Sequence, residues 1–386
     1  MAAPAVLNRR QDAGIWRHLD VVLVAGSVLI SLFGCLMVYT ATRDGLEAAG
    51  LSPTYYVKKQ AIFVVIGIGV MFAVAAIDYR KFRDWAPAIY GLSIVMLIGV
   101  FVVGHKSKGA QAWFQFGSYQ LEPSEFVKIA LIISLATYCS ASKGGLPGRA
   151  LVAVLALSAI PFLLIYKQPD LGTALVLAAV LAAMLLIAGA SGRHLAVMAM
   201  ITIVAGFGVV HFGVLKSYQQ ARLTSFVNSP DQPDAALLRS AAGASEYNLA
   251  QSKITIGDGG LTGKGIGKGP QTNLSYVPEQ RTDFIFTAVG EQTGLVGSGL
   301  LLLLFALVIW RTWQAATLSR DRVGMLICVG VLAMLTFQVF ENIGMTMGIM
   351  PVAGIPLPFM SYGGSALIAT FAGMGLVLNV RMRRFS

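Results

Sequence analysis

Two residues of opposite charge, Glu125 and Lys128, lie three positions apart in the segment GAQAWFQFGSYQLEPSEFVK, residues 109–128. At this spacing they share one face of a helix that begins at Pro123 and Ser124. The helix continues as an apolar run, so both charges sit at the end of a buried element, where ionisable groups are costly. We therefore expect a functional ion pair, although a capped helix start with a local pair would have the same sequence.

A second polar interruption, from Lys167 to Asp170, separates two apolar runs in the segment YKQPDLGTA, residues 166–174. Pro169 favours a tight turn there. Asp170 directly precedes the next apolar run, where an aspartate is a good helix N-cap. We expect Asp170 either to cap a helix or to supply a carboxylate to a site, with Lys167 beside it.

A third candidate, Asp283, ends the long segment 216–283 and stands directly before the apolar sequence FIF. This position holds a carboxylate at a boundary between water and an apolar environment, where ionisable groups are functional candidates. Such a carboxylate can act as a general base. A helix cap would explain the same position.

Glycines crowd the later part of that segment, GDGGLTGKGIGKGPQTNLSYVPEQRTD, residues 257–283. The spacing does not fit a nucleotide-binding P-loop, because Lys264 and Lys268 are each followed by glycine and not by Ser or Thr. Consecutive backbone N–H groups with two lysines could still bind an anion such as a pyrophosphate. A flexible glycine loop is the alternative.

The fourth segment is PVAGIPLPFMSYGGSAL, residues 351–367. Its three prolines break any helix, and Gly363 and Gly364 permit close approach of other backbone. Irregular backbone at membrane depth is tolerated only where protein or a cavity covers it. We therefore expect the four segments to line one cavity.

The elements that must position these residues are apolar runs of about 20 residues, the length of a transmembrane helix. Of the 386 residues 56% are hydrophobic and 12% charged, whereas soluble proteins have about 25% charged residues. We exclude a soluble enzyme and predict an all-α integral membrane protein, one polytopic domain of about ten transmembrane helices. The predicted bounds are 20–41, 60–77, 86–104, 123–140, 149–166, 171–190, 194–215, 284–313, 322–340 and 361–380. The long loop 216–283 lies between the seventh and eighth helices.

An even number of spans places both termini on one side of the membrane. Lys and Arg of the short loops are more numerous on that side, so the positive-inside rule predicts cytoplasmic termini and an extracytoplasmic 216–283 loop. Most acidic residues fall on the outer side, so the chemistry should face outward. Anionic lipid headgroups account for the formal charge of +11, and nucleic acid is not needed as a partner.

These segments resemble, in order and topology, the motifs of the SEDS family (shape, elongation, division and sporulation), over nearly all of the chain. The stretch YNLAQSKITIGDGGLTGKG is more similar to the rod-shape branch, RodA, than to the division branch, FtsW. The resemblance implies a peptidoglycan glycosyltransferase of the bacterial cytoplasmic membrane. Its expected activity is polymerisation of lipid II on the outer face, for cell elongation and shape.

The resemblance also implies roles for individual residues. Carried over motif by motif, the family's catalytic aspartate falls on Asp283 and its acidic and basic pair on Glu125 and Lys128. The aspartate of its QPDLGT motif falls on Asp170 and its outer-loop tryptophan on Trp113. The sequence departs from the family at four positions: Ala112 where many members have arginine, Glu122 where glutamine is common, Arg281 where histidine is common, and Gln292 where a second glutamate often follows.

The implied reaction is attack by the 4-hydroxyl of one lipid-linked sugar on the anomeric carbon of another, with loss of undecaprenyl diphosphate. An inverting transfer needs a base for the hydroxyl proton, and Asp283 is the candidate. Cations can stabilise the leaving diphosphate. Those available on the outer side are Lys128, Lys167, Arg222 and Lys264. A divalent cation such as Mg²⁺ or Mn²⁺ is left open, because Mg²⁺ often binds through one or two carboxylates and substrate phosphates.

Two other functions fit the same sequence features. A lipid-linked precursor flippase also needs a polar cavity among broken helices, and a non-catalytic scaffold of the cell-wall synthesis complex would use Asp283 only as a cap. The partners implied by the resemblance are lipid II, a class B penicillin-binding protein (a transpeptidase), other membrane proteins of the elongation complex, and membrane lipids.

Overall fold

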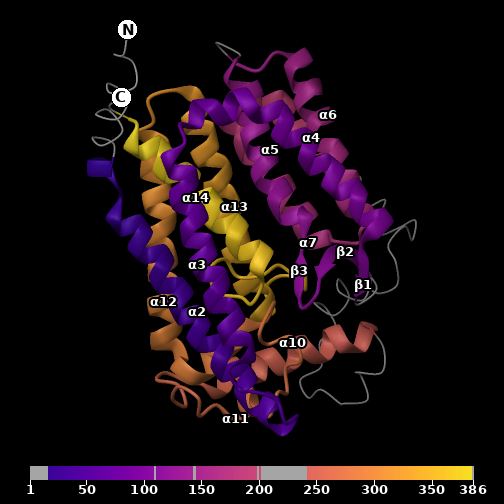
Figure 1. The fold of residues 1–386 in the computed structure, drawn as a ribbon, viewed down its shortest axis with the longest axis vertical. Coiled ribbons are helices and arrows are strands. Elements are labelled where there is room, and N and C mark those ends of the chain that lie inside the picture. The colour runs from indigo at the N-terminus through magenta and orange to yellow at the C-terminus, as the bar shows by residue number, and fades with distance from the viewer. Residues whose placement is uncertain (1–15, 108–109, 142–144, 198–199, 201–240, 385–386) are drawn as a thin grey trace.

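The computed structural model describes residues 16–107, 110–141, 145–197, 200 and 241–384. These residues form a bundle of long helices in which α2 begins and α14 ends at the same end (Figure 1). The helices are η1 (Trp16–His18), α2 (Val21–Ala48), α3 (Tyr55–Ala76), α4 (Tyr79–Val103), α5 (Pro123–Ser140), α6 (Gly148–Lys167), α7 (Leu171–Ile187), α10 (Ala241–Asp258), α11 (Pro270–Asn273), α12 (Ile285–Thr317), α13 (Arg322–Thr346) and α14 (Gly364–Met382).

Among the described residues, seven helices are long and apolar enough to cross a membrane: α2, α3, α4, α6, α12, α13 and α14. α7 is apolar but has only 17 residues. α13 and α14 form the centre of the bundle, with 67% and 78% of their most apolar windows buried, whereas α3 and α4 have 28% and 22%. The outer helices therefore present much of their apolar surface to lipid, as expected where the solvent is a bilayer.

The predicted spans outside 194–215 each fall on a described helix, and the predicted 123–140 has the same bounds as α5. Residues 194–215 lie largely outside the described part of the chain, so the ten-span count and the single-domain organisation stay predictions. Several helices extend past the apolar runs. α2 continues to Ala48 and α3 begins at Tyr55. The apolar run marks only the part of a helix that lies in the hydrocarbon layer, and the helix can continue beyond it with polar residues.

A small antiparallel sheet, which the all-α prediction did not include, precedes α5. Its strands are β1 (His105–Ser107), β2 (Ala110–Phe116) and β3 (Tyr119–Leu121), in the order β1-β2-β3. Phe116 pairs with Tyr119 across a two-residue turn whose first residue, Gly117, has φ +60°, a conformation that glycine adopts readily. The sheet lies toward the end of the bundle opposite the chain ends (Figure 1).

Helix α12 is broken at Gly294, which has φ 64° and ψ −163°. The glycine-rich segment satisfies the backbone groups that the break leaves unpaired. Lys264 N and Gly265 N donate to Glu291 O and Gln292 O at 2.9 and 3.0 Å, while Leu295 N and Val296 N donate to Gly260 O and Leu261 O at 2.9 and 3.0 Å. A side chain at Gly294 would collide with the backbone of Leu261 and Gly263. The glycines thus allow a loop to dock against a broken helix, and residues 257–269 form an ordered, packed structure.

Candidate active site

Glu125 and Lys128 form an ion pair inside the protein. Lys128 Nζ lies 2.7 Å from Glu125 Oε2, and the two side chains are 2% and 4% exposed. Both project from the first two turns of α5, where Pro123 occupies the start of the helix. The pair is therefore not a solvent-exposed helix pair, and removing either partner would leave an uncompensated buried charge.

Glu122 joins this ion pair to the sheet. It is the N-cap residue of α5. Its Oε2 accepts a hydrogen bond from Trp113 Nε1 of β2 at 3.1 Å, and its Oε1 accepts one from Ser124 Oγ at 3.0 Å. Its backbone N–H donates to Ser365 Oγ at the start of α14, at 2.9 Å. Burial, with Asp170 and Glu125 nearby, raises the pKa of Glu122 to about 8. Burial and the neighbouring carboxylates thus favour the protonated form of Glu122, which limits repulsion among the three carboxyl groups.

Asp170 caps α7 and also keeps one oxygen unused. Its side chain accepts a hydrogen bond from Thr173 N, with Oδ1 at 2.9 Å, so the capping interpretation is confirmed for that atom. Oδ2 is buried without a hydrogen-bond partner among the residues that the structure describes. Most buried polar atoms are hydrogen-bonded, so such an atom calls for a functional or solvent partner. Gly172, two residues later, packs against the carbonyl of Ala353.

Asp283 is half-buried at the start of α12. The N-cap position of this helix belongs to Phe284, which makes no side-chain capping bond, so Asp283 does not occupy the N-cap. The backbone of Asp283 is fixed from α13, because Asn342 Nδ2 donates to Asp283 O and to Ile355 O, both at 2.7 Å. Ser361 Oγ donates to Thr282 O at 2.6 Å. The backbone that carries the Asp283 side chain is thus held at both Thr282 and Asp283.

Arg281, two residues before Asp283, lines a cavity of about 180 Å³ between the end of α2, the start of α3 and residues 275–281. Its guanidinium carbon lies 4.4 Å from the centre of the Tyr56 ring. Tyr56 in turn contacts Tyr362 edge to face, with ring centroids 5.1 Å apart. A cation stacked on an aromatic ring beside a polar cavity is well placed to hold an anionic or sugar-bearing ligand.

The proline-rich segment 351–363 connects the two groups of residues. Near one end it packs on Gly172 beside Asp170, and near the other Tyr362 N donates to Arg281 O at 2.9 Å. Gly364 packs directly on the Phe63 ring, which is the close approach expected at this glycine. The structure therefore gathers Trp113, Glu125, Lys128 and Asp170 around Glu122 and ties Asp283 to them through one irregular segment.

The remaining predicted cations lie elsewhere. Lys264 Nζ pairs with Asp258 Oδ1 at 2.9 Å on a partly exposed part of the glycine-rich segment. The N–H groups of Gly263, Lys264, Gly265 and Gly267 donate to acceptors within the protein, so the row of free N–H groups expected of an anion site is absent at these positions. Lys167 is exposed at the end of α6. Arg222 lies outside the described residues. Substrate binding by these three cations stays a prediction.

No group of three or more His, Cys, Asp or Glu side chains that could hold a metal occurs in the described ranges. Near Glu122, the carboxylate of Glu125 is already paired with Lys128. A cation held by one or two carboxylates and by substrate phosphates would not need such a group.

Sequence reasoning missed three buried polar residues near the site. Glu122 appeared only as a departure from the family, and Asn342 was not considered. Glu291, which is fully buried, accepts hydrogen bonds from Gln271 N and Thr272 N at 2.7 and 2.9 Å and so holds the start of α11. Glu291 could have been recognised from the sequence, because it is an acidic residue within a predicted span. Burying a carboxylate there is energetically costly unless it has hydrogen-bond partners.

A sequence profile of the FtsW/RodA/SpoVE family, described as cell cycle proteins, matches residues 20–385. The chain belongs to this family.

Individual relatives agree with this assignment. The chain is 34% identical over 372 residues to peptidoglycan glycosyltransferase MrdB of Escherichia coli (strain K12), covering 95% of this chain and 94% of that protein. It is 33% identical over 365 residues to stage V sporulation protein E of Bacillus subtilis (strain 168), covering 94% and 96%. Both alignments span nearly the whole of each protein.

Solved structures extend the likeness to the fold. One match is a chain of a peptidoglycan synthase complex, whose structure concerns the coordination of polymerization and crosslinking. Its TM-score is 0.78 at 28% identity, and the match covers 95% of this chain and 99% of that chain. Rod shape determining protein RodA of Thermus thermophilus matches with a TM-score of 0.68 at 28% identity, covering 95% and 98%. The prediction of a mostly helical, multi-pass membrane protein of the SEDS family is confirmed.

Proposed function

We propose that this family member is a peptidoglycan glycosyltransferase that polymerises lipid II at the outer face of the bacterial cytoplasmic membrane, in cell elongation and shape. The observation that carries the proposal is 34% identity over nearly the full length to a protein named peptidoglycan glycosyltransferase. The RodA fold and the buried polar cluster around Glu122 support it.

In the proposed reaction Asp283 is the general base. It takes the proton from the 4-hydroxyl of one lipid-linked sugar as that oxygen bonds to the anomeric carbon of a second. The bond from that carbon to the diphosphate oxygen breaks, and undecaprenyl diphosphate leaves with the electron pair. The half-buried position of Asp283 and its fixed backbone support this role, because a base must be held within hydrogen-bond reach of its proton.

We assign substrate binding to the other predicted residues: Trp113, Glu125, Lys128, Lys167, Asp170, Arg222 and Lys264. Lys128 is the best supported of the cations, because it is buried and held by Glu125. A fixed positive charge in a site shielded from water stabilises developing negative charge more strongly than one in solvent. The unused oxygen of Asp170 is an acceptor for a substrate hydroxyl or amide.

We further propose that both termini are cytoplasmic and that the segment 216–283 faces outward, with ten spans in total. The start of α2 and the end of α14 lie at one end of the bundle, and α10 and α11 lie at the other (Figure 1). A class B penicillin-binding protein is the proposed partner, which the match to a synthase complex supports. Outward-facing chemistry would deliver glycan strands directly to that transpeptidase.

The test is polymerisation of supplied lipid II by the purified full-length protein, alone and with its transpeptidase partner. We expect glycan polymers with the wild type and none with Asp283→Asn. Parallel reactions with Mg²⁺, Mn²⁺ or EDTA measure any metal requirement. A flippase would move lipid II across reconstituted vesicles without making polymer, and a scaffold would change only the partner's activity. Either pattern, in protein that is folded, refutes the proposal.

A further inference from the structure

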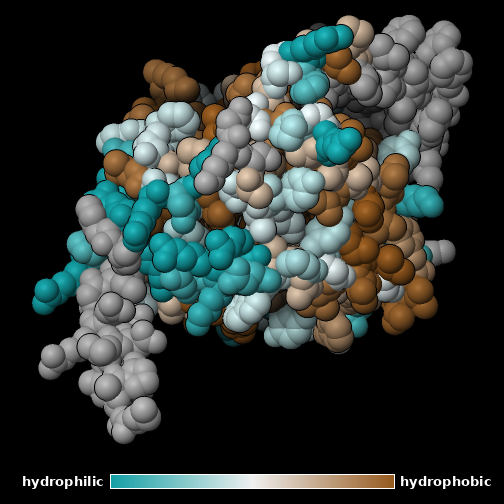
Figure 2. Space-filling model, turned by 90° about the horizontal axis from the view of Figure 1, so that it is seen from above, coloured by the Kyte–Doolittle hydropathy of each residue, from teal (hydrophilic) through white to brown (hydrophobic). Residues whose placement is uncertain are grey.

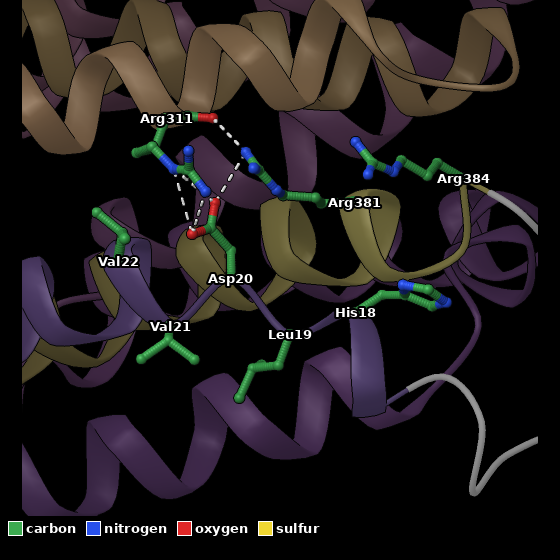
Figure 3. Close-up of a pocket in the computed structure, with 8 residues that line it drawn as sticks. All are labelled: His18, Leu19, Asp20, Val21, Val22, Arg311, Arg381 and Arg384. Atoms are coloured by element: carbon green, nitrogen blue, oxygen red, sulfur yellow. Dashed lines mark hydrogen bonds and ion pairs between the residues drawn. The ribbon is translucent and has the colours of Figure 1, made fainter.

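A second polar cavity lies at the other end of the protein, where α2 begins and α14 ends. It has a volume of about 260 Å³. Figure 3 shows the cavity between the start of α2, the second half of α12 and the end of α14. The lining residues that matter here are Asp20, Val21, Val22, Arg311, Arg381 and Arg384. The candidate active site uses none of them.

Two arginines in this cavity share one carboxylate. The side chain of Asp20 is fully buried. Its Oδ1 accepts from Arg311 Nη2 at 2.7 Å, and its Oδ2 accepts from Arg311 Nε at 3.0 Å and lies 2.8 Å from Arg381 Nη1. The two arginine side chains remain 20% and 11% exposed. Arg384 also lines the cavity (Figure 3). Arg311 Nη1 donates to Gln314 Oε1 at 3.0 Å, and Arg381 Nη1 also donates to Arg311 O at 3.4 Å. The lining therefore has three arginines and one carboxylate, an excess of positive charge that favours a phosphate group.

Aromatic residues place the cavity at the level of a membrane surface. Trp310 and Trp313, 54% and 50% exposed, flank Arg311 on α12. Trp16 and Trp85, 41% and 49% exposed, belong to elements at this same end of the bundle. Exposed tryptophans gather at the boundary between hydrocarbon and water. Figure 2, which views this end from above, shows hydrophilic side chains gathered on it and hydrophobic side chains along one flank.

The apolar part of the lining continues along a helix face. Val21 and Val22 are 66% and 42% exposed, and farther along α2 Leu29 and Leu32 are 54% and 56% exposed. An acyl chain can lie against this face while the cavity holds a headgroup. The cavity is smaller than the roughly 300–1,000 Å³ typical of sites that enclose a drug-sized ligand, so it suits a headgroup and not a whole lipid.

We propose that this cavity binds the phosphate of an anionic phospholipid headgroup through Arg311, Arg381 and Arg384, with an acyl chain lying on α2. Basic pockets between transmembrane helices bind anionic headgroups by the same chemistry. The bound lipid would connect α2, α12 and α14, and so would hold together three helices whose ends are otherwise joined here through Asp20.

The test uses the full-length protein in detergent micelles with equal amounts of phosphatidylglycerol and phosphatidylcholine, and counts retained lipids by native mass spectrometry. We expect the wild type to retain phosphatidylglycerol in preference to phosphatidylcholine. Arg384→Gln should weaken that preference about fivefold, which corresponds to the roughly 1 kcal/mol that one arginine contributes near an anionic surface. Arg320→Gln is the matched control, because Arg320 is exposed in the loop after α12 and does not line the cavity.

A second variant keeps the test valid if a single charge has a small effect. Arg381→Gln combined with Arg384→Gln removes two of the three cations and leaves Asp20 paired with Arg311, and it should lower retention of phosphatidylglycerol further. Equal retention of the two lipids by the wild type overturns the proposal. So does a loss in Arg320→Gln as large as that in Arg384→Gln. Competition by millimolar inorganic phosphate that removes the lipid would assign the cavity to a soluble phosphate instead of a lipid.

Discussion

Breaking the ion pair between Glu125 and Lys128 should destabilise the protein far more than breaking a surface pair. In Glu125→Gln, Lys128 is left 1% exposed and without its carboxylate partner. Removing one partner of a buried pair costs about 3–5 kcal/mol, whereas an exposed helix pair contributes about 0.3–0.5 kcal/mol. Combining Glu125→Gln with Lys128→Met removes both charges, so most of the lost stability should return.

The stability of each variant is measured by thermal unfolding in detergent, and its activity by polymerisation of lipid II. The matched control is Asp84→Asn, which breaks the exposed pair between Arg83 and Asp84 and should change stability by less than about 1 kcal/mol. We expect the double variant to be stable but inactive, because we propose that both charges take part in substrate binding. A double variant that is both stable and active would show that the pair is only structural, and wild-type behaviour of the two single variants would refute the burial argument.

Three further predictions concern the base, the buried carboxyl and the topology. Asp283→Asn should lower turnover about 10²- to 10⁴-fold, roughly 3–5 kcal/mol of barrier, with unchanged thermal stability; turnover within about threefold of wild type would exclude Asp283 as the base. Because the pKa of Glu122 is raised from 4.5 to about 8, the unfolded state loses this proton first and the stability that Glu122 contributes should fall as pH rises through that window. Glu122→Gln should lack this part of the pH dependence of unfolding, and an unchanged profile would contradict the raised pKa. Single cysteines at positions 229 and 386, replacing Ser229 and Ser386 in a Cys-free background, should react with an impermeant thiol reagent in intact cells only at 229; labelling at 386 alone would reverse the topology.

The sequence was most informative where one local property decides the structure. Apolar runs predict the membrane-embedded helices, and Pro123 followed by Ser124 predicts the start of α5, because proline at the first turn and a charged first turn are local signals. The N-cap role of Asp170 was one of the two alternatives that the sequence offered, for the same reason. Bounds were less accurate where helices continue beyond the apolar layer, since hydropathy changes there and helicity does not.

Long-range partners were not predictable from spacing. β2, which contains Trp113, is held in place by pairing with its neighbouring strands and by the hydrogen bond from Trp113 to Glu122, which lies beyond the next strand. The glycine-rich segment suggested either an anion site or a flexible loop. In the structure this segment docks on α12, because it exchanges hydrogen bonds with the backbone groups around Gly294, which only the folded chain brings near. The burial of Glu122 likewise depends on elements far apart in sequence.

The break in α12 has a consequence for how sequence change can accumulate in this protein. Across residues 291–296, hydrogen bonds to the glycine-rich segment replace hydrogen bonds within the helix. The first turns of α12 are therefore oriented by that segment and by Asn342. The remainder of α12 exposes Leu300 and Leu303, among others, to its surroundings. Substitutions that tune this remainder to bilayers of different thickness therefore leave the direction of Asp283 unaltered, and the two ends of one helix are free to diverge under separate constraints.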